Sequence, residues 1–199
     1  MDVIEIDTPH GPARAHITKV RGARGGLILG HGAGGGVGAR DLTAAAEAAA
    51  AEGFSVALVE QPYRVAGRRS PAPAAQLDAA WTAVVASLRR GALRRLPLVT
   101  GGRSSGARVA CRTAAATGAI GVLCLAFPLH PPGRPEKSRL DELDSVTVPV
   151  LVVQGESDPF GMPPDGPTRM LVRLRGNHSL SSDVVGLRTA VGEWLAQVR

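Results

Sequence analysis

Short apolar runs alternate with amphipathic stretches along almost the whole chain. The run at residues 120–126 shows no polar alternation, which is typical of parallel strands buried on both faces of a sheet. Between the runs, apolar residues recur at helical spacing, as at Leu77, Trp81, Val84, Val85 and Leu88. This alternation predicts an α/β fold, a mostly parallel twisted sheet with helices on both faces.

The same pattern places the individual elements. We expect strands at residues 3–6, 15–20, 27–29, 54–59, 96–100, 120–126, 148–153 and 169–174. We expect helices at residues 42–52, around 77–88, at 105–117 and at 184–198. Residues 128–149 are interpreted as a loop with a short helix, and residues 159–167 contain too much proline and glycine for a good helix. The chain, residues 1–199, is interpreted as a single domain.

Composition excludes several classes of protein. Hydrophobic residues make up 44% of the chain and charged residues 20%, as in ordinary globular proteins. Only two cysteines occur, Cys111 and Cys124, so we expect a reducing, cytoplasmic setting and a core role for both. The amino terminus has no secretory pattern, and no run of about 18 apolar residues exists, so we expect no membrane partner.

The basic net charge of +6 suggests an acidic partner only weakly. The arginines are scattered rather than clustered, and aromatic residues, at 3%, offer little surface for stacking bases, so we expect no nucleic-acid partner. The histidines and cysteines show neither H-E-x-x-H nor C-x-x-C spacing. We therefore expect no metal and no cofactor.

The strongest motif is G-x-S-x-G, formed by Gly102, Ser104 and Gly106 between an expected strand and an expected helix. A serine on such a sharp turn projects above the edge of the sheet, and flanking glycines make room for the tight backbone. The start of a helix also favours the negative charge that develops in acyl transfer. The context therefore makes Ser104 a candidate nucleophile.

A nucleophilic serine needs a base, and the base needs an orienting acid. Asp158 follows the strand at 148–153, with Glu156 as the competing carboxylate, and His178 follows the strand at 169–174. The carboxyl ends of parallel strands meet at one edge of the sheet, where open α/β sheets place their sites. The alternative is that Asp158 and His178 are ordinary turn and loop residues, which the order Ser, Asp, His disfavours.

The glycine-rich string Gly30–Gly36 follows the strand at 27–29 and can present backbone N–H groups to one point. We expect the N–H groups of Ala33 (or Gly34) and Ser105 to form an oxyanion hole. Gly34 is a candidate for substrate contact. His31 is interpreted as bracing this loop rather than transferring a proton.

Gly30, Gly32 and Gly35 also satisfy the G-x-G-x-x-G pattern of dinucleotide-binding folds, with Glu60 ending the next strand. Two observations disfavour that alternative. The next helix does not begin until about residue 40, so no helix amino terminus meets a pyrophosphate at the glycines. Glu60 is also 25 residues beyond Gly35 rather than about 20.

With these elements in order, the chain resembles the α/β-hydrolases over nearly its whole length. The resemblance implies the α/β-hydrolase fold and a Ser104–His178–Asp158 triad. Since 199 residues leave no room for a large lid, we expect a minimal lid or none and a shallow, open site.

Two strings are similar to a smaller hydrolase-like family, which includes testis-expressed protein thirty and NSL complex subunit three. They read GGRSSGARVA from Gly101 and LAFPLHPPG from Leu125. Bacterial members of that family resemble dienelactone hydrolases. Position 105 is usually larger and apolar there, so Ser105 is a departure. His130 lies in the second string and is a candidate for substrate contact, although a loop-capping role is the favoured interpretation.

These observations predict a serine hydrolase of acyl bonds, most simply a carboxylesterase acting on a small ester. The alternative is a non-catalytic interaction module on a hydrolase fold, because a fold does not fix a function. A nucleotide-binding protein is a third, weaker possibility.

Overall fold

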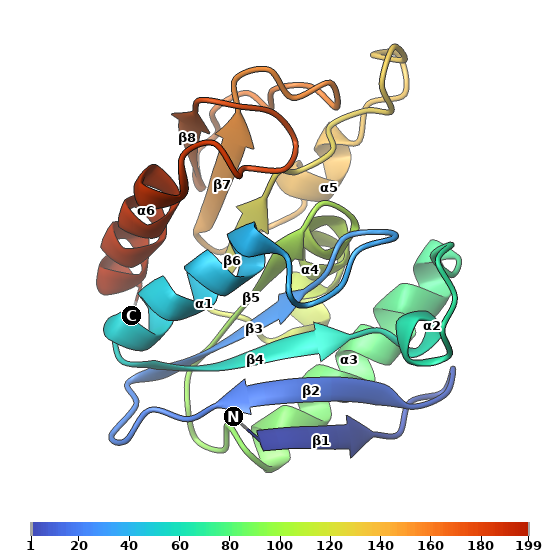
Figure 1. Ribbon diagram of the computed structural model, residues 1–199, viewed down its shortest axis with the longest axis vertical. Coiled ribbons are helices and arrows are strands. Elements are labelled where there is room, and N and C mark those ends of the chain that lie inside the picture. Colours follow the sequence, from blue (N-terminus) through green and yellow to red (C-terminus); the bar gives the residue numbers. More distant parts are fainter. Residues whose placement is uncertain (1, 199) are drawn as a thin grey trace.

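Eight strands form one sheet in the order β1-β2-β4-β3-β5-β6-β7-β8 in the computed structural model, which describes residues 2–198 (Figure 1). The strands are β1 (Asp2–Ile6), β2 (Ala13–Thr18), β3 (Gly25–Gly30), β4 (Phe54–Glu60), β5 (Leu98–Arg103), β6 (Gly121–Leu125), β7 (Val150–Gly155) and β8 (Arg169–Leu174). β2 runs antiparallel to β1 and β4, whereas the other neighbouring pairs are parallel. The predicted mostly parallel sheet is confirmed.

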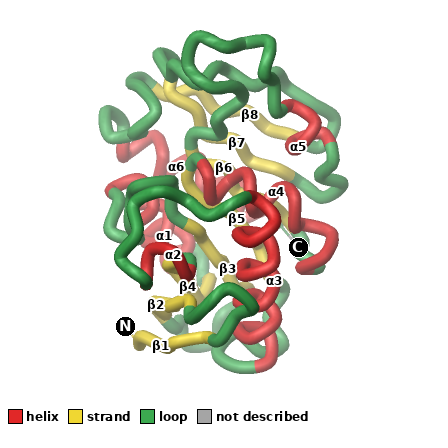
Figure 2. The backbone as a smooth tube through the Cα atoms, turned by 90° about the vertical axis from the view of Figure 1, so that its right-hand side faces the viewer, coloured by secondary structure: helices red, strands yellow, loops and turns green. Residues whose placement is uncertain are grey.

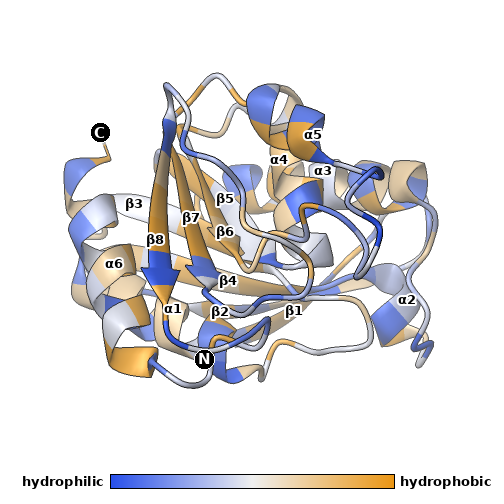
Figure 3. Ribbon diagram, turned by 90° about the horizontal axis from the view of Figure 1, so that it is seen from above, coloured by the Kyte–Doolittle hydropathy of each residue, from blue (hydrophilic) through white to orange (hydrophobic). Residues whose placement is uncertain are grey.

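Helices cover both faces of the sheet. They are α1 (Arg40–Ala51), α2 (Pro62–Val65), α3 (Ala74–Arg90), α4 (Ser105–Thr117), α5 (Leu140–Asp144) and α6 (Val184–Gln197). Leu27 and Leu29 of β3 lie in the same apolar cluster as α1 and α6, whereas Ile28 lies in the cluster that contains α3. Successive strand residues therefore serve opposite faces, which explains why the strands lack polar alternation. Figure 3 shows apolar residues concentrated on the central strands and both polar and apolar residues on the helices.

The main differences from the predicted elements have local causes. β5 continues to Arg103 rather than ending at residue 100, because Gly101 and Gly102 are strand residues that allow close backbone approach rather than turn residues. The second strand occupies residues 13–18 rather than 15–20, since its pairing with β1 and β4 ends at Thr18. The short helix α2 was not predicted, although Pro62 stands at its first position, a common start signal.

Two connections between the last strands depart from the usual helical crossover. The segment between β6 and β7 carries only the five-residue α5, and the one between β7 and β8 carries no helix, as the sequence predicted. Arg108 of α4 donates two hydrogen bonds to Glu142, at 2.8 and 2.6 Å, and so fixes α5 against the body of the molecule. In residues 2–198 no separate lid domain covers the site edge of the sheet.

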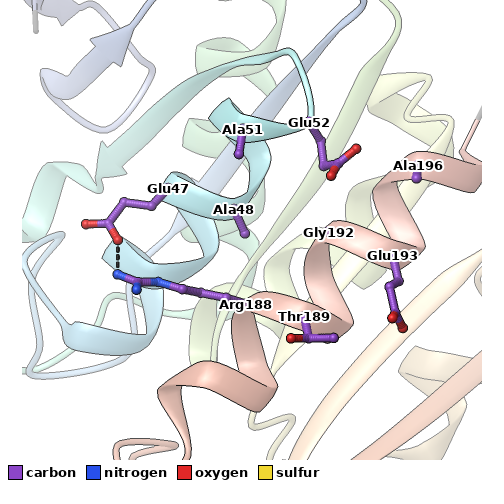
Figure 4. Close-up of a pocket in the computed structure, with 9 residues that line it drawn as sticks. All are labelled: Glu47, Ala48, Ala51, Glu52, Arg188, Thr189, Gly192, Glu193 and Ala196. Atoms are coloured by element: carbon purple, nitrogen blue, oxygen red, sulfur yellow. Dashed lines mark hydrogen bonds and ion pairs between the residues drawn. The ribbon is translucent and has the colours of Figure 1, made fainter.

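The helices α1 and α6 lie side by side on one face, with a groove between them (Figure 4). Small residues such as Ala48, Ala51 and Gly192 line it, and an ion pair between Glu47 and Arg188 crosses it. None of the predicted site residues lies in this groove. The groove is therefore a surface feature separate from the candidate site.

The parallel strands run in the same direction and therefore end at a common edge of the sheet. Figure 2 draws the loops that connect the strands and helices in green. The loops that follow β3, β5, β7 and β8 carry the predicted site residues to this edge.

No helix in residues 2–198 combines the length and apolar character needed to cross a bilayer.

Trp81 is the largest of the fully buried side chains, and it packs α3 against the sheet at 1% exposure. We expect Trp81→Ala to lower the free energy of unfolding by about 3–5 kcal/mol, because it leaves a cavity between helix and sheet. Val185→Ala is the control, since Val185 is 75% exposed, and it should change stability by less than about 0.5 kcal/mol. Urea denaturation measures both, and equal effects would contradict the packing described.

Candidate active site

Ser104 occupies a sharp turn between β5 and α4. Its φ of 52° and ψ of −110° are unusual for a residue other than glycine. Its N–H donates to the carbonyl oxygen of Leu125 at 2.9 Å, which fixes the turn against β6. A Cβ atom at either Gly102 or Gly106 would come within 2.5 Å of the Gly30 carbonyl oxygen. Glycine is therefore required on both sides of the turn by the close approach of β3.

The structure brings together the three side chains that the sequence singled out. The Oγ of Ser104 lies 2.9 Å from Nε2 of His178, and Nδ1 of His178 lies 2.8 Å from Oδ2 of Asp158. The Asp158 side chain is 1% exposed and that of His178 is 17% exposed. Glu156, the competing carboxylate, is exposed and makes no ion pair with His178 within residues 2–198. These contacts form a continuous hydrogen-bonded chain from a hydroxyl to a buried carboxylate.

The hydrogen-bond partners of His178 determine where the protons of the Ser104–His178–Asp158 network lie. A carboxylate oxygen only accepts, so Nδ1 of His178 carries the hydrogen and donates it to Asp158. The lone pair of Nε2 then faces Ser104, whose hydroxyl donates to it. This tautomer is the one in which the imidazole can take a proton from the serine.

Two further donors satisfy the Asp158 carboxylate. Nε2 of Gln154 donates to Oδ2 at 2.8 Å, and the N–H of Phe160 donates to Oδ1 at 2.9 Å. The same Gln154 nitrogen lies 3.1 Å from the Phe127 carbonyl oxygen and 2.9 Å from that of Gly161. Since all three neighbours accept, the orientation of the fully buried amide is fixed. Sequence reasoning missed Gln154; its one signal was a polar residue within an otherwise apolar strand.

Phe160 was also missed. Its ring lies over the His178 imidazole, with centroids 4.2 Å apart and planes tilted by 31°. The ring covers one face of the imidazole and restricts its rotation. The sequence signal was an aromatic residue two positions after the acid, in a chain with only three phenylalanines.

The glycine-rich loop lies against the nucleophile. A Cβ at Gly32 would lie 3.4 Å from Cβ of Ser104. The loop then turns, with the N–H of Gly35 donating to the Gly32 carbonyl at 3.2 Å and Gly34 at a φ of 69°. Ala33 and Gly34 are exposed at the tip. Within residues 2–198 the N–H groups of Ala33 and Ser105 donate to no protein acceptor, so both are free to bind a ligand oxygen.

His31 is buried behind this loop and makes two hydrogen bonds. Its Nδ1–H donates to the Gly32 carbonyl at 2.9 Å, and its Nε2 accepts from the Gln61 N–H at 3.1 Å. Its ring meets Tyr63 edge-on at 5.7 Å between centroids. Burial lowers the pKa of His31, which keeps the imidazole neutral and able to accept from Gln61. His31 therefore connects the glycine-rich loop to the residue that follows β4 through these two hydrogen bonds, which is a structural role.

His130 lies next to Phe160. Its N–H donates to the Phe160 carbonyl at 3.0 Å, and its Nδ1–H donates to the Pro131 carbonyl at 2.9 Å. Its ring occupies the space that a side chain at position 161 would fill, so that position is glycine. These contacts agree with the loop-capping interpretation of His130.

The other reactive residue types are the possible metal ligands and the two cysteines. Within residues 2–198 no cluster of three or more metal-ligating side chains occurs. Cys111 and Cys124 are buried, with their sulfur atoms 3.5 Å apart. The hydrogen bond with Cys111, together with burial, raises the pKa of the Cys124 thiol well above its usual value. A thiol of that kind is a poor nucleophile.

Comparison with known proteins identifies the family of the chain. The model of the α/β hydrolase domain family matches residues 23–181, so the chain belongs to that family. No curated protein matches the chain in sequence. The finer resemblance, to the family of testis-expressed protein thirty and NSL complex subunit three, stays a prediction.

Solved structures with the same fold include several hydrolases. An α/β serine hydrolase homologue from Coxiella burnetii has 18% identity and a TM-score of 0.78, over 98% of this chain and 97% of that one. An α/β serine hydrolase without a lid from Xanthomonas campestris has 22% identity and a TM-score of 0.76, over 96% and 92%. Est1E from Butyrivibrio proteoclasticus has 17% identity and a TM-score of 0.79, over 97% of each chain. At these identities the likeness establishes the fold.

The lowered pKa of His31 predicts a pH-dependent stability. Because the unfolded chain binds this proton more readily, the free energy of unfolding should fall as pH drops below about 6.5, by up to about 1.4 kcal/mol per pH unit. In His31→Gln, whose amide oxygen can accept from Gln61, this contribution should vanish. Urea denaturation at about pH 7.5 and about pH 5.5 gives the comparison. An equal loss of stability in the two proteins would show that His31 is not the group responsible.

Proposed function

We propose that this protein is a serine hydrolase of acyl bonds, acting as a carboxylesterase on small esters. The observation that carries the proposal is the hydrogen-bonded chain Ser104–His178–Asp158, with distances of 2.9 and 2.8 Å. Membership of the α/β hydrolase family supports the same reading.

In the first half of the proposed reaction, the Ser104 hydroxyl attacks the ester carbonyl carbon and gives its proton to Nε2 of His178. The imidazolium that forms is stabilised by Asp158. The carbonyl oxygen becomes an oxyanion, which accepts hydrogen bonds from the N–H groups of Ala33 and Ser105. The imidazolium then donates the proton to the leaving alkoxide, and the alcohol departs from the acyl-enzyme.

In the second half, His178 takes a proton from a water molecule, which attacks the acyl carbon of the Ser104 ester. The second oxyanion collapses, the serine oxygen recovers its proton from His178, and the carboxylic acid leaves. Gln154 and Phe160 hold the carboxylate and the imidazole in place throughout both halves.

The preference for small esters rests on the open site. No lid domain encloses Ser104 within residues 2–198, and the loop beside it carries only glycine and alanine at positions 32–36. Such a surface offers little apolar area to a long acyl chain. Est1E, which has a similar fold, has been solved with ferulic acid bound, so esters of that aromatic acid belong in a substrate panel with short alkyl esters.

A fluorophosphonate probe, with the adduct mapped by mass spectrometry, tests the nucleophile. We expect a single adduct on Ser104, and in Ser104→Ala both the adduct and ester hydrolysis should be lost, with kcat falling by about four to six orders of magnitude. Ser70→Ala, which removes an exposed hydroxyl in the segment after α2, should behave as the unmodified protein. p-Nitrophenyl acetate should be hydrolysed with a higher kcat/KM than the octanoate.

An inert Ser104 in a protein shown to be folded would contradict this proposal. The non-catalytic interaction module would then be the better reading, and a search for a binding partner would replace the substrate panel.

A further inference from the structure

Arg103 is the last residue of β5 and immediately precedes Ser104. Its Nε donates to Oδ2 of Asp41 at 2.7 Å, and its Nη2 donates to the backbone carbonyl oxygen of His178 at 3.2 Å. Asp41 lies in the first turn of α1, directly after the glycine-rich loop, and its side chain is 1% exposed. One guanidinium thus joins the nucleophile strand, the start of α1 and the histidine loop.

The same guanidinium also touches the glycine-rich loop. A Cβ at Gly32 would come within 2.8 Å of Nη1 of Arg103. The absence of a side chain at Gly32 therefore leaves the space that the guanidinium occupies beside Ser104. The segments it connects are far apart in sequence, since Asp41 is 62 residues and His178 is 75 residues from Arg103.

We propose that Arg103 is a positioning residue that holds both His178 and the glycine-rich loop in place relative to Ser104. This inference rests on the hydrolase activity proposed above and deepens it. Arg103 does not touch the reacting atoms. It acts on His178 through the backbone carbonyl and on the loop through Asp41 and Gly32.

Stability alone gives little reason for this arrangement. A buried ion pair contributes little net stability, because desolvation of the two charges offsets their attraction. Burial raises the pKa of Asp41, whereas the charge of Arg103 lowers it, so the carboxylate depends on the arginine for its ionised form. The rigid, planar guanidinium donates from two separate nitrogens, Nε to Asp41 and Nη2 to the His178 carbonyl, whereas a lysine carries all its donors on one nitrogen.

Arg112 provides a matched comparison. Its side chain is 20% exposed against 19% for Arg103, and it too pairs with carboxylates, those of Asp78 and Glu142. These partners belong to α3 and α5, and Arg112 lies about 12 Å along α4 from the nucleophile, given a rise of about 1.5 Å per residue. Arg112 thus has the same chemistry and burial as Arg103 without a contact to His178 or the glycine loop.

The test compares Arg103→Met, Arg103→Lys and Arg112→Met in the full chain. The first readout is kcat and KM for p-nitrophenyl acetate. The second is NMR of protein labelled with ¹⁵N-histidine, in which the Nδ1–H that His178 donates to Asp158 gives a signal assigned with His178→Ala. The second readout reports the position of His178 without turnover.

We expect Arg103→Met to lower kcat by about 10- to 100-fold, while KM changes by less than about threefold, because a displacement of about 1 Å at reacting groups has an effect of this size. The His178 signal should shift or broaden. Arg103→Lys should recover only part of kcat, since it restores the charge but has a single donor nitrogen in place of the two that Arg103 uses. Arg112→Met should leave both readouts unchanged.

The proposal is overturned if Arg103→Met matches Arg112→Met in kcat and in the His178 signal. Should Arg103→Met fail to fold, the double variant Arg103→Met with Asp41→Leu replaces it, because it leaves no buried charge unpaired. The proposal requires that this folded double variant also has a lowered kcat and lacks the native His178 signal. An unmodified protein without esterase activity would contradict the proposed function, and the NMR comparison would still decide the role of Arg103.

Discussion

The candidate site depends on the close approach of the end of β3 to the turn between β5 and α4. The Gly30 carbonyl oxygen lies 2.5 Å from the positions that Cβ atoms of Gly102 and Gly106 would occupy. Any larger residue at these positions would push the two backbones apart. This contact places the glycine-rich loop beside Ser104, and it lets the serine adopt a positive φ at the start of α4. The nucleophile and its two proposed oxyanion donors thus occupy adjacent positions because three backbones meet without side chains between them.

The polar side chains of the site lie at the ends of strands, since the strand interiors are apolar on both faces. Each buried carboxylate there is matched with donors from neighbouring strands, helices and loops. Asp158 accepts from His178, Gln154 and the Phe160 N–H, and Asp41 accepts from Arg103 and the Leu42 N–H. A buried carboxylate without such donors would be strongly unfavourable. The two networks meet at His178, whose ring contacts Asp158 and whose backbone carbonyl contacts Arg103. The position of the imidazole is therefore fixed from both its side chain and its backbone.

The strands, the helices and the three residues Ser104, Asp158 and His178 could be predicted from the sequence, because each depends on a local pattern. Apolar runs mark the strands, and a residue just beyond a strand end, such as Asp158 or His178, must lie at the loop edge of a parallel sheet. The reasoning failed where the determining contact is distant in sequence. Nothing near Arg103 indicates that its partner is Asp41, and an arginine in a soluble chain is ordinarily a solvated charge. Gln154 was passed over partly for the same reason, since its acceptors lie in two different loops and one of them, the Phe127 carbonyl, is 27 residues away.

The glycines of the loop after β3 show how one pattern can serve two architectures. In a dinucleotide-binding fold, G-x-G-x-x-G lets the backbone approach a pyrophosphate at the start of a helix. Here α1 begins only at Arg40, and the glycines approach protein instead. Gly30 lies against Trp81 and Gly106, and Gly32 lies against Arg103 and Ser104. Close contacts with the nucleophile turn and with Arg103 therefore explain why these positions are glycine. No bound phosphate is needed to explain the motif. A glycine motif shows that the backbone is closely approached at that point. The position of the next helix then determines whether a bound phosphate or another part of the protein makes that approach.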